Sequence, residues 1–272
     1  MVNISICILN YNGAKHLQDC LESVPFSIAG VNVEKLLIDN ASSDDSWRMA
    51  RNYGFRVIHA DNKYQFITGL NTALTQFQMD YILFSQADLK FGKDSIRHLI
   101  KEVENDHLAI VQPVFYRGQG KCDNAGMHWI WPGYGISRTF PKSLKTYLTS
   151  IVTSITFVTS RKAIEKIGLF DERFAPAYYE DCDYSLRAKK VGIKLKVCPL
   201  SIIFHKHTSS FSKLYSKDGL SKLCYENRMK LVEKHYNGFD RWLRLKTIRV
   251  AQKIYTGRIF SDSRIASASS LQ

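Results

Sequence analysis

The chain has 272 residues, of which 45% are hydrophobic, so it can bury the core of one large α/β domain or of two small ones. Its Lys and Arg side chains exceed its Asp and Glu side chains by 13, and a surface so basic should attract phosphate groups on nucleotides, nucleic acids or anionic lipids. No apolar run reaches the roughly 18–20 residues of a membrane-spanning helix, no charged leader precedes the first apolar run, and the cysteines show no paired spacing, so we expect no signal peptide, disulfide framework or zinc site.

Compact apolar segments alternate with segments of helical periodicity in the first third of the chain. The apolar segments are 4–9, 35–38, 55–58 and 81–84, and the helical segments between them are 17–24, 47–52 and 68–77. This rhythm predicts an α/β fold with a doubly wound, mostly parallel central sheet flanked by helices.

Polar side chains close each of these predicted strands. They are Asn10, Tyr11 and Asn12 after the first strand, Asp39 after the second, Asp61 and Asn62 after the third, and Asp88 after the fourth. A single acid in such a position most often caps the next helix. Ligands of doubly wound sheets bind outside the carboxyl ends of the strands, so the repetition indicates several potential contacts along one edge.

The second half of the chain continues with mixed elements. We expect a helix at 95–104, strands at 109–114 and 153–160, a short helix at 161–168 that ends at a glycine, and a strand at 193–197. Segment 118–138 is rich in glycine and aromatic residues and predicts a long loop or an irregular hairpin.

Glu180, Asp181 and Asp183 crowd three carboxylates into four positions at a predicted helix start. Such crowding raises the pKa values of the acids. The plain interpretation is an acidic first turn, which suits the positive end of the helix dipole. The strand that follows leads to His205 and His207, and this combination favours one half of an active site.

Several segments then form one ordered set: Asn10-Tyr11-Asn12-Gly13, LIDNASSD at 37–44, Ala60-Asp61-Asn62 with Gly69 and Asn71, GLFDERF at 168–174, Glu180-Asp181-Cys182-Asp183, and Phe204-His205. In this order, and over residues 3 to 210, the chain resembles family 2 glycosyltransferases with the GT-A fold, in particular the rhamnosyltransferase-like branch. The resemblance implies transfer of a sugar, with inversion, from a nucleotide diphosphate sugar to a hydroxyl group of a glycan or lipid-linked acceptor in surface polysaccharide biosynthesis. Rhamnose from a dTDP donor is the leading expectation, and a UDP-hexose is the close second.

The resemblance also assigns roles to individual residues. Positions expected at the nucleotide or its sugar are Asn10, Tyr11, Asn12, Asp39, Asn62, Asn71 and Gln86. Asp88 and His205 are expected to contact Mg²⁺ or Mn²⁺ on the diphosphate, and Asp181 is expected to be the general base.

On the acceptor side we expect Trp129, Glu180 and Asp183. Trp129 belongs to an aromatic group with Trp131 and Tyr134, which either stacks on a sugar or forms a small cluster under the loop. His207 is more simply a solvated histidine.

The metal motif departs from the family pattern. Where the family has D-x-D or N-x-D, this chain has Gln86-Ala87-Asp88, and Gln86 offers only a neutral oxygen. A nucleotide-sugar or glycan-binding paralogue with impaired catalysis is therefore the alternative function. Nucleic-acid binding, suggested by charge alone, finds no recognised module, and we expect no nucleic-acid partner.

The predicted domain organisation is a glycosyltransferase domain at 1–212, made of a nucleotide-sugar half at 1–90 and an acceptor half at 91–212, followed by a basic helical extension at 213–272. Between 241 and 264 the chain has seven basic residues and one acid, and 242–259 can form an amphipathic helix. This helix either packs on the domain or lies on an anionic membrane. We expect a cytoplasmic protein, in the second case peripheral to the inner face of the cell membrane.

Overall fold

The structure is a computed structural model that describes residues 1–60, 66–118, 120–206 and 216–268, with backbone only at 217 and 255–268. The chain divides into two compact units. One consists of residues 1–129 and 135–210, and the other of residues 130–134 and 211–272. The boundary predicted between residues 212 and 213 lies outside the described residues.

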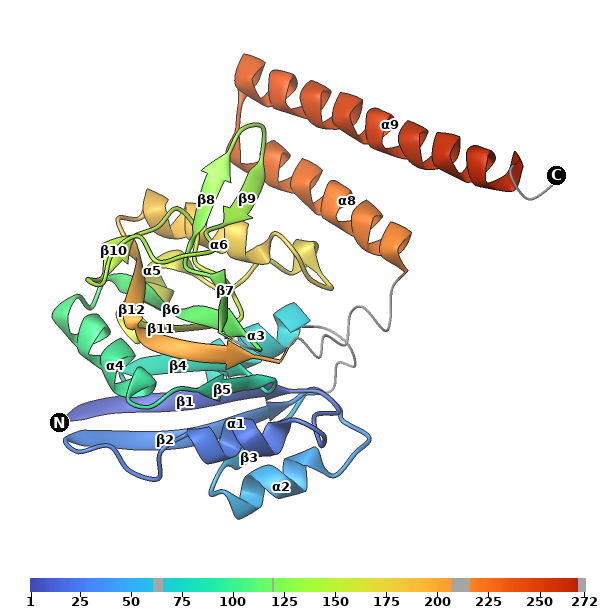
Figure 1. The fold of residues 1–272 in the computed structure, drawn as a ribbon. Coiled ribbons are helices and arrows are strands. Elements are labelled where there is room, and N and C mark those ends of the chain that lie inside the picture. Colours follow the sequence, from blue (N-terminus) through green and yellow to red (C-terminus); the bar gives the residue numbers. More distant parts are fainter. Residues whose placement is uncertain (61–65, 119, 207–215, 269–272) are drawn as a thin grey trace. The chain divides into compact units, whose positions relative to one another are not determined.

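A ten-stranded sheet forms the centre of the first unit (Figure 1). Its main path runs β10-β12-β6-β11-β4-β1-β2-β3, with β5 paired to β12 and β7 paired to β6. The strands are β1 (Val2–Asn10), β2 (Val31–Asp39), β3 (Arg56–His59), β4 (Tyr81–Gln86), β5 (Leu89–Phe91), β6 (Ala109–Arg117), β7 (Lys121–Asn124), β10 (Tyr147–Leu148), β11 (Thr156–Ser160) and β12 (Lys194–His205). Parallel pairs join β3, β2, β1 and β4, and also β6 and β12, while β11 runs antiparallel between β4 and β6. The expected mostly parallel α/β sheet is confirmed.

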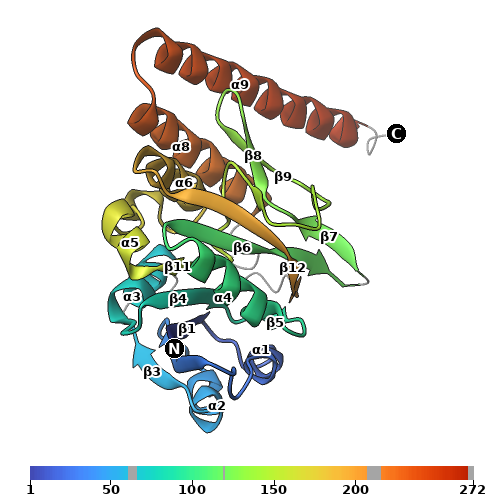
Figure 2. The same ribbon diagram turned by 90° about the vertical axis from the view of Figure 1, so that its left-hand side faces the viewer.

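Helices cover both faces of this sheet (Figure 2). They are α1 (Leu17–Ser23), α2 (Ser46–Asn52), α3 (Phe66–Gln76), α4 (Ser95–Asn105), α5 (Arg161–Ile167) and α6 (Glu180–Lys190), with a 3₁₀ turn η1 (Glu172–Phe174) between the last two. The central strand β1 is therefore fully buried from Ile4 to Ile8 and reads as a continuous apolar run rather than an alternating one.

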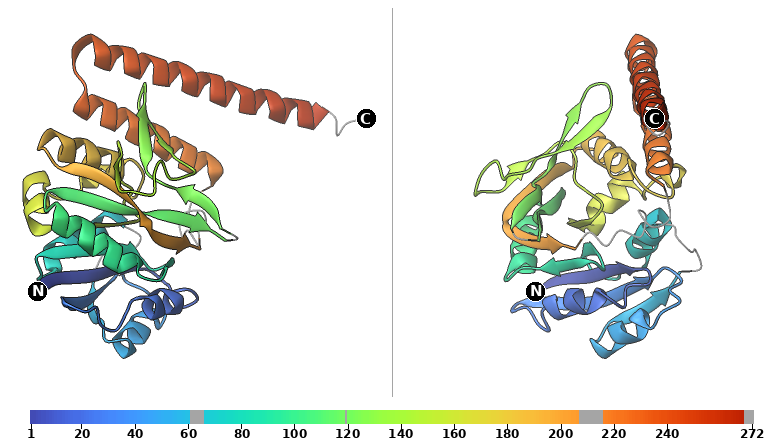
Figure 3. Two further views of the ribbon diagram at one scale, coloured as in Figure 1. Left: turned by 60° about the vertical axis from the view of Figure 1, so that its left-hand side comes forward. Right: turned by 45° about the vertical axis from the view of Figure 1, so that its right-hand side comes forward.

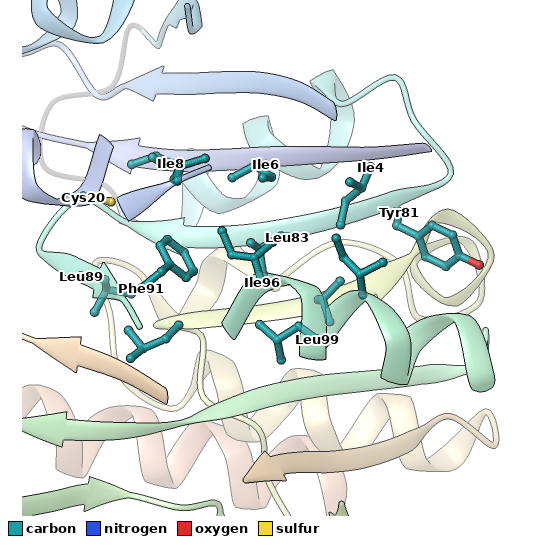
Figure 4. Packing of buried hydrophobic residues seen from close by; sticks show 14 of the residues in the cluster. Ile4, Ile6, Ile8, Cys20, Tyr81, Leu83, Leu89, Phe91, Ile96 and Leu99 are labelled. Carbon is teal, nitrogen blue, oxygen red and sulfur yellow. The ribbon is translucent and has the colours of Figure 1, made fainter. Parts of the chain in front are cut away.

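Side chains of β1 alternate between the two layers. Ile4, Ile6 and Ile8 belong to the main core cluster with Ile96 and Leu99 of α4 (Figure 4). Leu9 points the opposite way, toward α3, where the lack of a side chain at Gly69 makes room for it: a Cβ there would lie 2.5 Å from Leu9 Cδ1. Packing on both faces fixes where β1 ends, and thereby the position of Asn10.

Two regions of the sheet differ from the sequence-based expectation. Segment 118–138 contains β7 and a hairpin of β8 (Met127–Ile130) and β9 (Tyr134–Ser137), so the expected irregular hairpin is largely regular. The strand expected at 193–197 continues to His205 as β12, with a register shift between Cys198 and Ile202. This extension brings His205 alongside β5.

The second unit contains α8 (Lys217–His235) and α9 (Gly238–Ala268), which form an antiparallel pair (Figure 3). The hairpin tip belongs to this unit as well. Arg228 of α8 covers the ring of Tyr134 at 3.7 Å, and Arg244 of α9 donates to the carbonyl of Pro132 at 3.2 Å. Among the described residues, no helix combines the length and the apolar character needed to cross a membrane.

Candidate active site

The end of β1 is fixed to the end of β2 through one buried side chain. The strand register places Asn10 opposite Asp39. Asn10 Nδ2 donates to Asp39 Oδ1 at 3.1 Å and to Ser46 Oγ at 2.7 Å. Gly13 packs directly on the same side chain, because a Cβ there would lie 2.2 Å from Asn10 Oδ1. Asn10 therefore organises this corner of the sheet and is itself buried.

Asp39 is almost completely buried and accepts several hydrogen bonds. Ser42 donates to it from its hydroxyl at 2.5 Å and from its backbone N–H at 3.2 Å. His59 Nδ1, from the end of β3, lies 3.2 Å from Asp39 Oδ2. The carboxylate is thus held in one orientation at the carboxyl ends of three neighbouring strands.

The turn after β1 completes this polar corner. Asn12 adopts a left-handed backbone with φ of 47°, donates its N–H to Ser42 Oγ at 2.9 Å and accepts from the N–H of Ser43 at 2.8 Å. Tyr11 lies half-buried in the same turn. Asn62 and His207, also singled out from the sequence, lie outside the described residues.

Asp88 and His205 meet at the next strand ends. The N–H of Ala87 donates to the carbonyl of Leu9 at 3.1 Å, which places Asp88 just beyond the ends of β1 and β4. The antiparallel pairing of β5 and β12 sets His205 opposite Leu89. His205 Nε2 consequently lies 3.3 Å from Asp88 Oδ2, and both side chains are about nine-tenths buried, with 10% and 9% exposure.

A carboxylate and an imidazole are both suitable donors for Mn²⁺, and the carboxylate suits Mg²⁺. Asp88 and His205 therefore fit as two protein ligands of a divalent cation. No group of three or more His, Cys, Asp or Glu side chains with metal-binding geometry occurs among the described residues. Such a cation would need further oxygen ligands from a bound molecule or from water. Gln86, the other polar residue of the motif, is half-buried at the end of β4, two positions before Asp88.

One short segment connects this region to the acidic cluster. The N–H of Gln86 donates to the carbonyl of Ile155 at 3.2 Å. The hydroxyl of Ser154 donates to Glu180 Oε1 at 2.7 Å. The end of β4 and the start of α6 are therefore separated only by residues 154 and 155.

Glu180 opens α6 after two tyrosines in an unusual conformation. Tyr178 and Tyr179 both have φ of 72°, a left-handed region that non-glycine residues rarely adopt and that costs free energy. The Glu180 side chain is buried, and its Oε2 finds no partner among the described residues. Burial first, and then the negative charge of Asp181, raise the pKa of Glu180 to about 8.

Asp181 is more accessible than Glu180 and is only half-buried. Its Oδ1 accepts from the N–H of Cys182 at 2.7 Å, and its side chain lines a small hollow with Ser154 and Phe170. Desolvation in this hollow raises the pKa of Asp181. A partly exposed carboxyl group with a raised pKa is suited to taking up a proton from a bound molecule.

Asp183 has different surroundings from the other two acids. Its side chain is fully buried and accepts from Arg187 Nε at 2.9 Å. Arg187 also donates to the carbonyls of Ile167 at 2.6 Å and Leu169 at 2.8 Å. This geometry favours a structural role, in which Asp183 anchors α6 to the end of α5, over the contact with an acceptor that we expected.

Asn71 is likewise engaged inside the protein. Its amide donates to the carbonyl of Phe170 at 3.0 Å and accepts from the N–H of Phe170 at 2.8 Å. A further bond, at 3.2 Å, joins it to Glu172 Oε1. These contacts favour a role in fixing segment 168–174 over the nucleotide contact that the motif implied.

The aromatic group is divided between the two units. Trp129 is half-buried on β8 in the first unit. Trp131 and Tyr134 belong to the second unit, where Tyr134 lies under Arg228. A shared aromatic platform is therefore not formed within the first unit, and the acceptor contact of Trp129 stays a prediction.

Sequence reasoning missed several partners of the site residues. His59 and Ser42 orient Asp39, and Ser154 orients Glu180. Ser42 lies inside a recognised motif and could have been found there. Ser154 and Glu180 are 26 positions apart, and no sequence signal joins them.

Comparisons with known proteins agree with one another. The family model for glycosyl transferase family 2 matches residues 5–168. A relative in Haloferax volcanii, a low-salt glycan biosynthesis hexosyltransferase named Agl10, is 21% identical over 75% of this chain and 67% of its own length. A dolichol-phosphate mannosyltransferase of Pyrococcus furiosus is 23% identical over 49% of this chain, which spans only 37% of that relative.

Solved structures show the same fold. Residues 1–349 of S. aureus TarS in complex with UDP-GlcNAc superpose with a TM-score of 0.61 at 16% identity, covering 85% of this chain and 66% of that fragment. GalNAc-T7 with UDP, GalNAc and Mn²⁺ superposes with a TM-score of 0.64 at 14% identity, covering 77% of this chain and 44% of that protein. At these identities the likeness concerns the fold.

Proposed function

The chain belongs to glycosyl transferase family 2 and is a glycosyltransferase with the GT-A fold, and from this premise we propose that it transfers a sugar, with inversion, from a nucleoside diphosphate donor to a hydroxyl group of a glycan or lipid-linked acceptor. Relatives support this choice of substrates. One is named for glycan biosynthesis, another for dolichol phosphate, and one solved neighbour contains UDP-GlcNAc.

The observation that carries the proposal is a continuous series of contacts along one edge of the sheet. It runs from Asp39 to Asn10, from Leu9 to Ala87, from Gln86 to Ile155, and from Ser154 to Glu180. A polar corner, a carboxylate–imidazole pair and a proton acceptor therefore follow one another in the first unit. These three features suit, in this order, a nucleoside, a diphosphate with its metal ion, and an acceptor hydroxyl.

The donor half of the site is assigned to the ends of β1, β2 and β4. Asn10, Tyr11, Asn12 and Asp39 would contact the nucleoside, and Gln86 would lie beside the diphosphate or sugar. Asp88 and His205 would hold Mg²⁺ or Mn²⁺, which when bound neutralises the charge that develops on the departing diphosphate. Because Asp39 is already held in one orientation, donor binding loses less side-chain conformational entropy.

Asp181 is assigned the proton transfer. It accepts the proton of the acceptor hydroxyl while that oxygen forms a bond to the anomeric carbon, and the bond from that carbon to the diphosphate breaks with both electrons leaving on the phosphate oxygen. One displacement of this kind inverts the anomeric centre. Glu180, whose pKa of about 8 keeps it largely protonated near neutral pH, spares Asp181 a second negative charge at its side.

The choice of donor sugar rests on the family resemblance and on the named relatives and neighbours. The resemblance to the rhamnosyltransferase-like branch favours dTDP-rhamnose, whereas the named hexosyltransferase relative and the UDP-GlcNAc neighbour favour a UDP-hexose. We retain rhamnose first and a UDP-hexose second.

A second candidate function has an observation of its own. Gln86 replaces an acid of the metal motif, which leaves a two-residue donor set at Asp88 and His205. A protein that binds a nucleotide sugar or a glycan but turns it over poorly would tolerate this change.

The cellular setting is assigned from the second unit. Phe239, Trp242, Val250 and Ile254 of α9 are at least half exposed and lie among Lys and Arg residues. Such a surface fits peripheral contact with an anionic membrane on the cytoplasmic side.

The proposal is tested by a donor screen. The full chain is incubated with dTDP-rhamnose, UDP-glucose, UDP-galactose and UDP-GlcNAc, with and without Mn²⁺, and nucleoside diphosphate release is measured. Release from one donor, with Asp88→Ala weakening its binding in calorimetry, is the expected result. Donor binding without release on any acceptor extract would establish the binding protein instead, and absence of both would refute the proposal.

A further inference from the structure

The connection between β9 and β10 has an unusual composition. From residue 124 to residue 164 the chain contains no Asp or Glu, but it contains Arg138, Lys142, Lys145, Arg161 and Lys162. Residues 136–148, the basic apolar loop, hold the first three of these. In a chain with 25 acids, a stretch of this length without one gives the loop an undiluted positive charge.

The same loop exposes large apolar side chains. Ile136 is 50% exposed, Phe140 62%, Leu144 82% and Leu148 65%. Scattered exposed apolar residues are normal, but four within thirteen positions are a concentration of the kind found at interaction sites.

The loop is held at both ends rather than hanging free. Arg138 exchanges backbone hydrogen bonds with Ala125 and Gly126, both at 2.8 Å. Tyr147 donates its hydroxyl to the carbonyl of Ala125 at 2.9 Å, and β10 pairs with β12. Residues 139–146 are therefore anchored at both ends. Docking of Phe140 and Leu144 on a partner would then order little additional backbone.

Positive charge is concentrated among these apolar groups. The guanidinium of Arg138 lies 5.5 Å from the centre of the Phe140 ring. Besides partial burial, the charges of Arg138 and Lys142 lower the pKa of nearby His128, so this histidine adds little charge near neutral pH. The permanent cations of the loop are thus Arg138, Lys142 and Lys145.

We propose that the basic apolar loop docks on the surface of an anionic lipid bilayer, with Phe140 and Leu144 in the interfacial region and Lys142 and Lys145 against the lipid phosphates. Aromatic and aliphatic side chains set among Lys and Arg are the combination that binds this interface. A soluble polyanion needs the cations but not the exposed Phe140 and Leu144. The inference rests on the loop alone and is independent of the transfer reaction.

The test is co-sedimentation of the full chain with vesicles of phosphatidylglycerol and phosphatidylcholine, compared with vesicles of phosphatidylcholine alone. Binding to the anionic vesicles should weaken about tenfold or more in the double variant Phe140→Ser/Leu144→Ser. In Lys142→Gln/Lys145→Gln it should weaken by about fivefold for each charge removed. The matched control is Phe26→Ser, which removes a 94% exposed aromatic ring from the segment between α1 and β2 and should bind like the unchanged chain.

Hydrogen exchange on the vesicles locates the contact, because protection should appear across residues 138–146. Since α9 is intact in every variant, binding through that helix alone would leave the double variant unchanged and overturn the proposal. Equal binding to neutral vesicles, equal loss in Phe26→Ser, or a dimer that dissociates in the double variant would do so too. Binding to soluble polyphosphate that survives removal of Phe140 and Leu144, without vesicle binding, would assign the loop to a polyanion. Donor binding should be the same in all variants, so failure here is distinct from failure of the transferase proposal.

Discussion

Asp181 and Glu180 are neighbours in sequence, yet their carboxyl groups have different surroundings. Asp181 is half-buried, whereas Glu180 is buried and accepts a hydrogen bond from Ser154. We expect Asp181→Asn to lower kcat by about 10²–10⁴-fold, because an amide cannot take the proton of the acceptor hydroxyl. Donor affinity, measured by calorimetry, should stay within about twofold, because Asp181 is assigned to the acceptor and not to the donor.

The pH dependence gives this prediction a second readout. Because desolvation raises the pKa of Asp181, the active base form accumulates only as pH rises through that raised value, and kcat should rise with it. A variant with near-normal kcat would remove Asp181 from the role of base.

We expect Glu180 to affect the pH dependence of the free energy of unfolding. The native state holds its proton up to a pKa of about 8, while the ordinary value is 4.5. Between these two pH values the unfolded chain binds fewer protons at this group than the native chain does. The free energy of unfolding therefore falls as pH rises, by about 1.4 kcal/mol per pH unit. Below pH 4.5 both states are protonated, and this stability is fully present.

In Glu180→Gln the amide oxygen still accepts from Ser154, but nothing titrates at this position. Urea unfolding at pH 5, 6.5 and 8 should therefore show a smaller loss of stability with pH than in the unchanged chain. An identical slope in both proteins would mean that Glu180 does not carry the raised pKa.

At the scale of elements, α3 is joined to segment 168–174 through Asn71. Replacing it by alanine leaves the buried N–H and carbonyl of Phe170 without their partner, which should cost about 2–3 kcal/mol of unfolding free energy. Thr72→Ala is the control, because the Thr72 hydroxyl donates to the Thr68 carbonyl within its own helix, and it should change stability by less than about 0.5 kcal/mol. If Asn71→Ala kept its stability but bound the donor more weakly, Asn71 would be assigned to the nucleotide contact instead.

Local pattern was enough to predict most elements of the first unit. Continuous apolar runs mark β1, β4 and β6, and the helical spacing at 95–104 matches α4 to within one residue. Two elements were beyond that reasoning. β5 has three residues and exists because β12 pairs with it, and the second half of β12 is recognisable only through that pairing. Both are non-local, and together they place His205.

At the scale of the molecule, the sequence motifs identified the strand ends that border the candidate site but not the contacts that their side chains make. Asp39 and Asp88 close strands at one edge of the sheet, as the alternation of strands and helices implies, whereas Asp181 lies in the first turn of α6 and is assigned through the family resemblance. Asp183 and Asn71 lie in the recognised motifs and resemble the other predicted site residues in type. Burial and contacts with Arg187 and Phe170 nevertheless favour structural roles for them. Burial depends on neighbours distant in the chain, which one sequence does not reveal.

The second unit shows the same limit most clearly, because residues 130–134 join helices that begin more than eighty positions later. A Cβ on Gly133 would lie 3.2 Å from a methyl group of Val232 and 3.5 Å from the side chain of Arg228. We therefore expect Gly133→Val to overpack this contact, at a cost of about 1–3 kcal/mol. Limited proteolysis should then cleave α8 and the start of α9 about tenfold faster or more, since local opening of the pair becomes more frequent.

Val250→Ala is the matched control, because it shortens an exposed side chain of α9 and should leave the cleavage rate unchanged. Donor binding by the first unit should also be retained in Gly133→Val, because every residue assigned to the donor lies within residues 1–129 and 135–210. Equal protection of α8 and α9 in both variants would show that the hairpin tip is not what holds the two helices together.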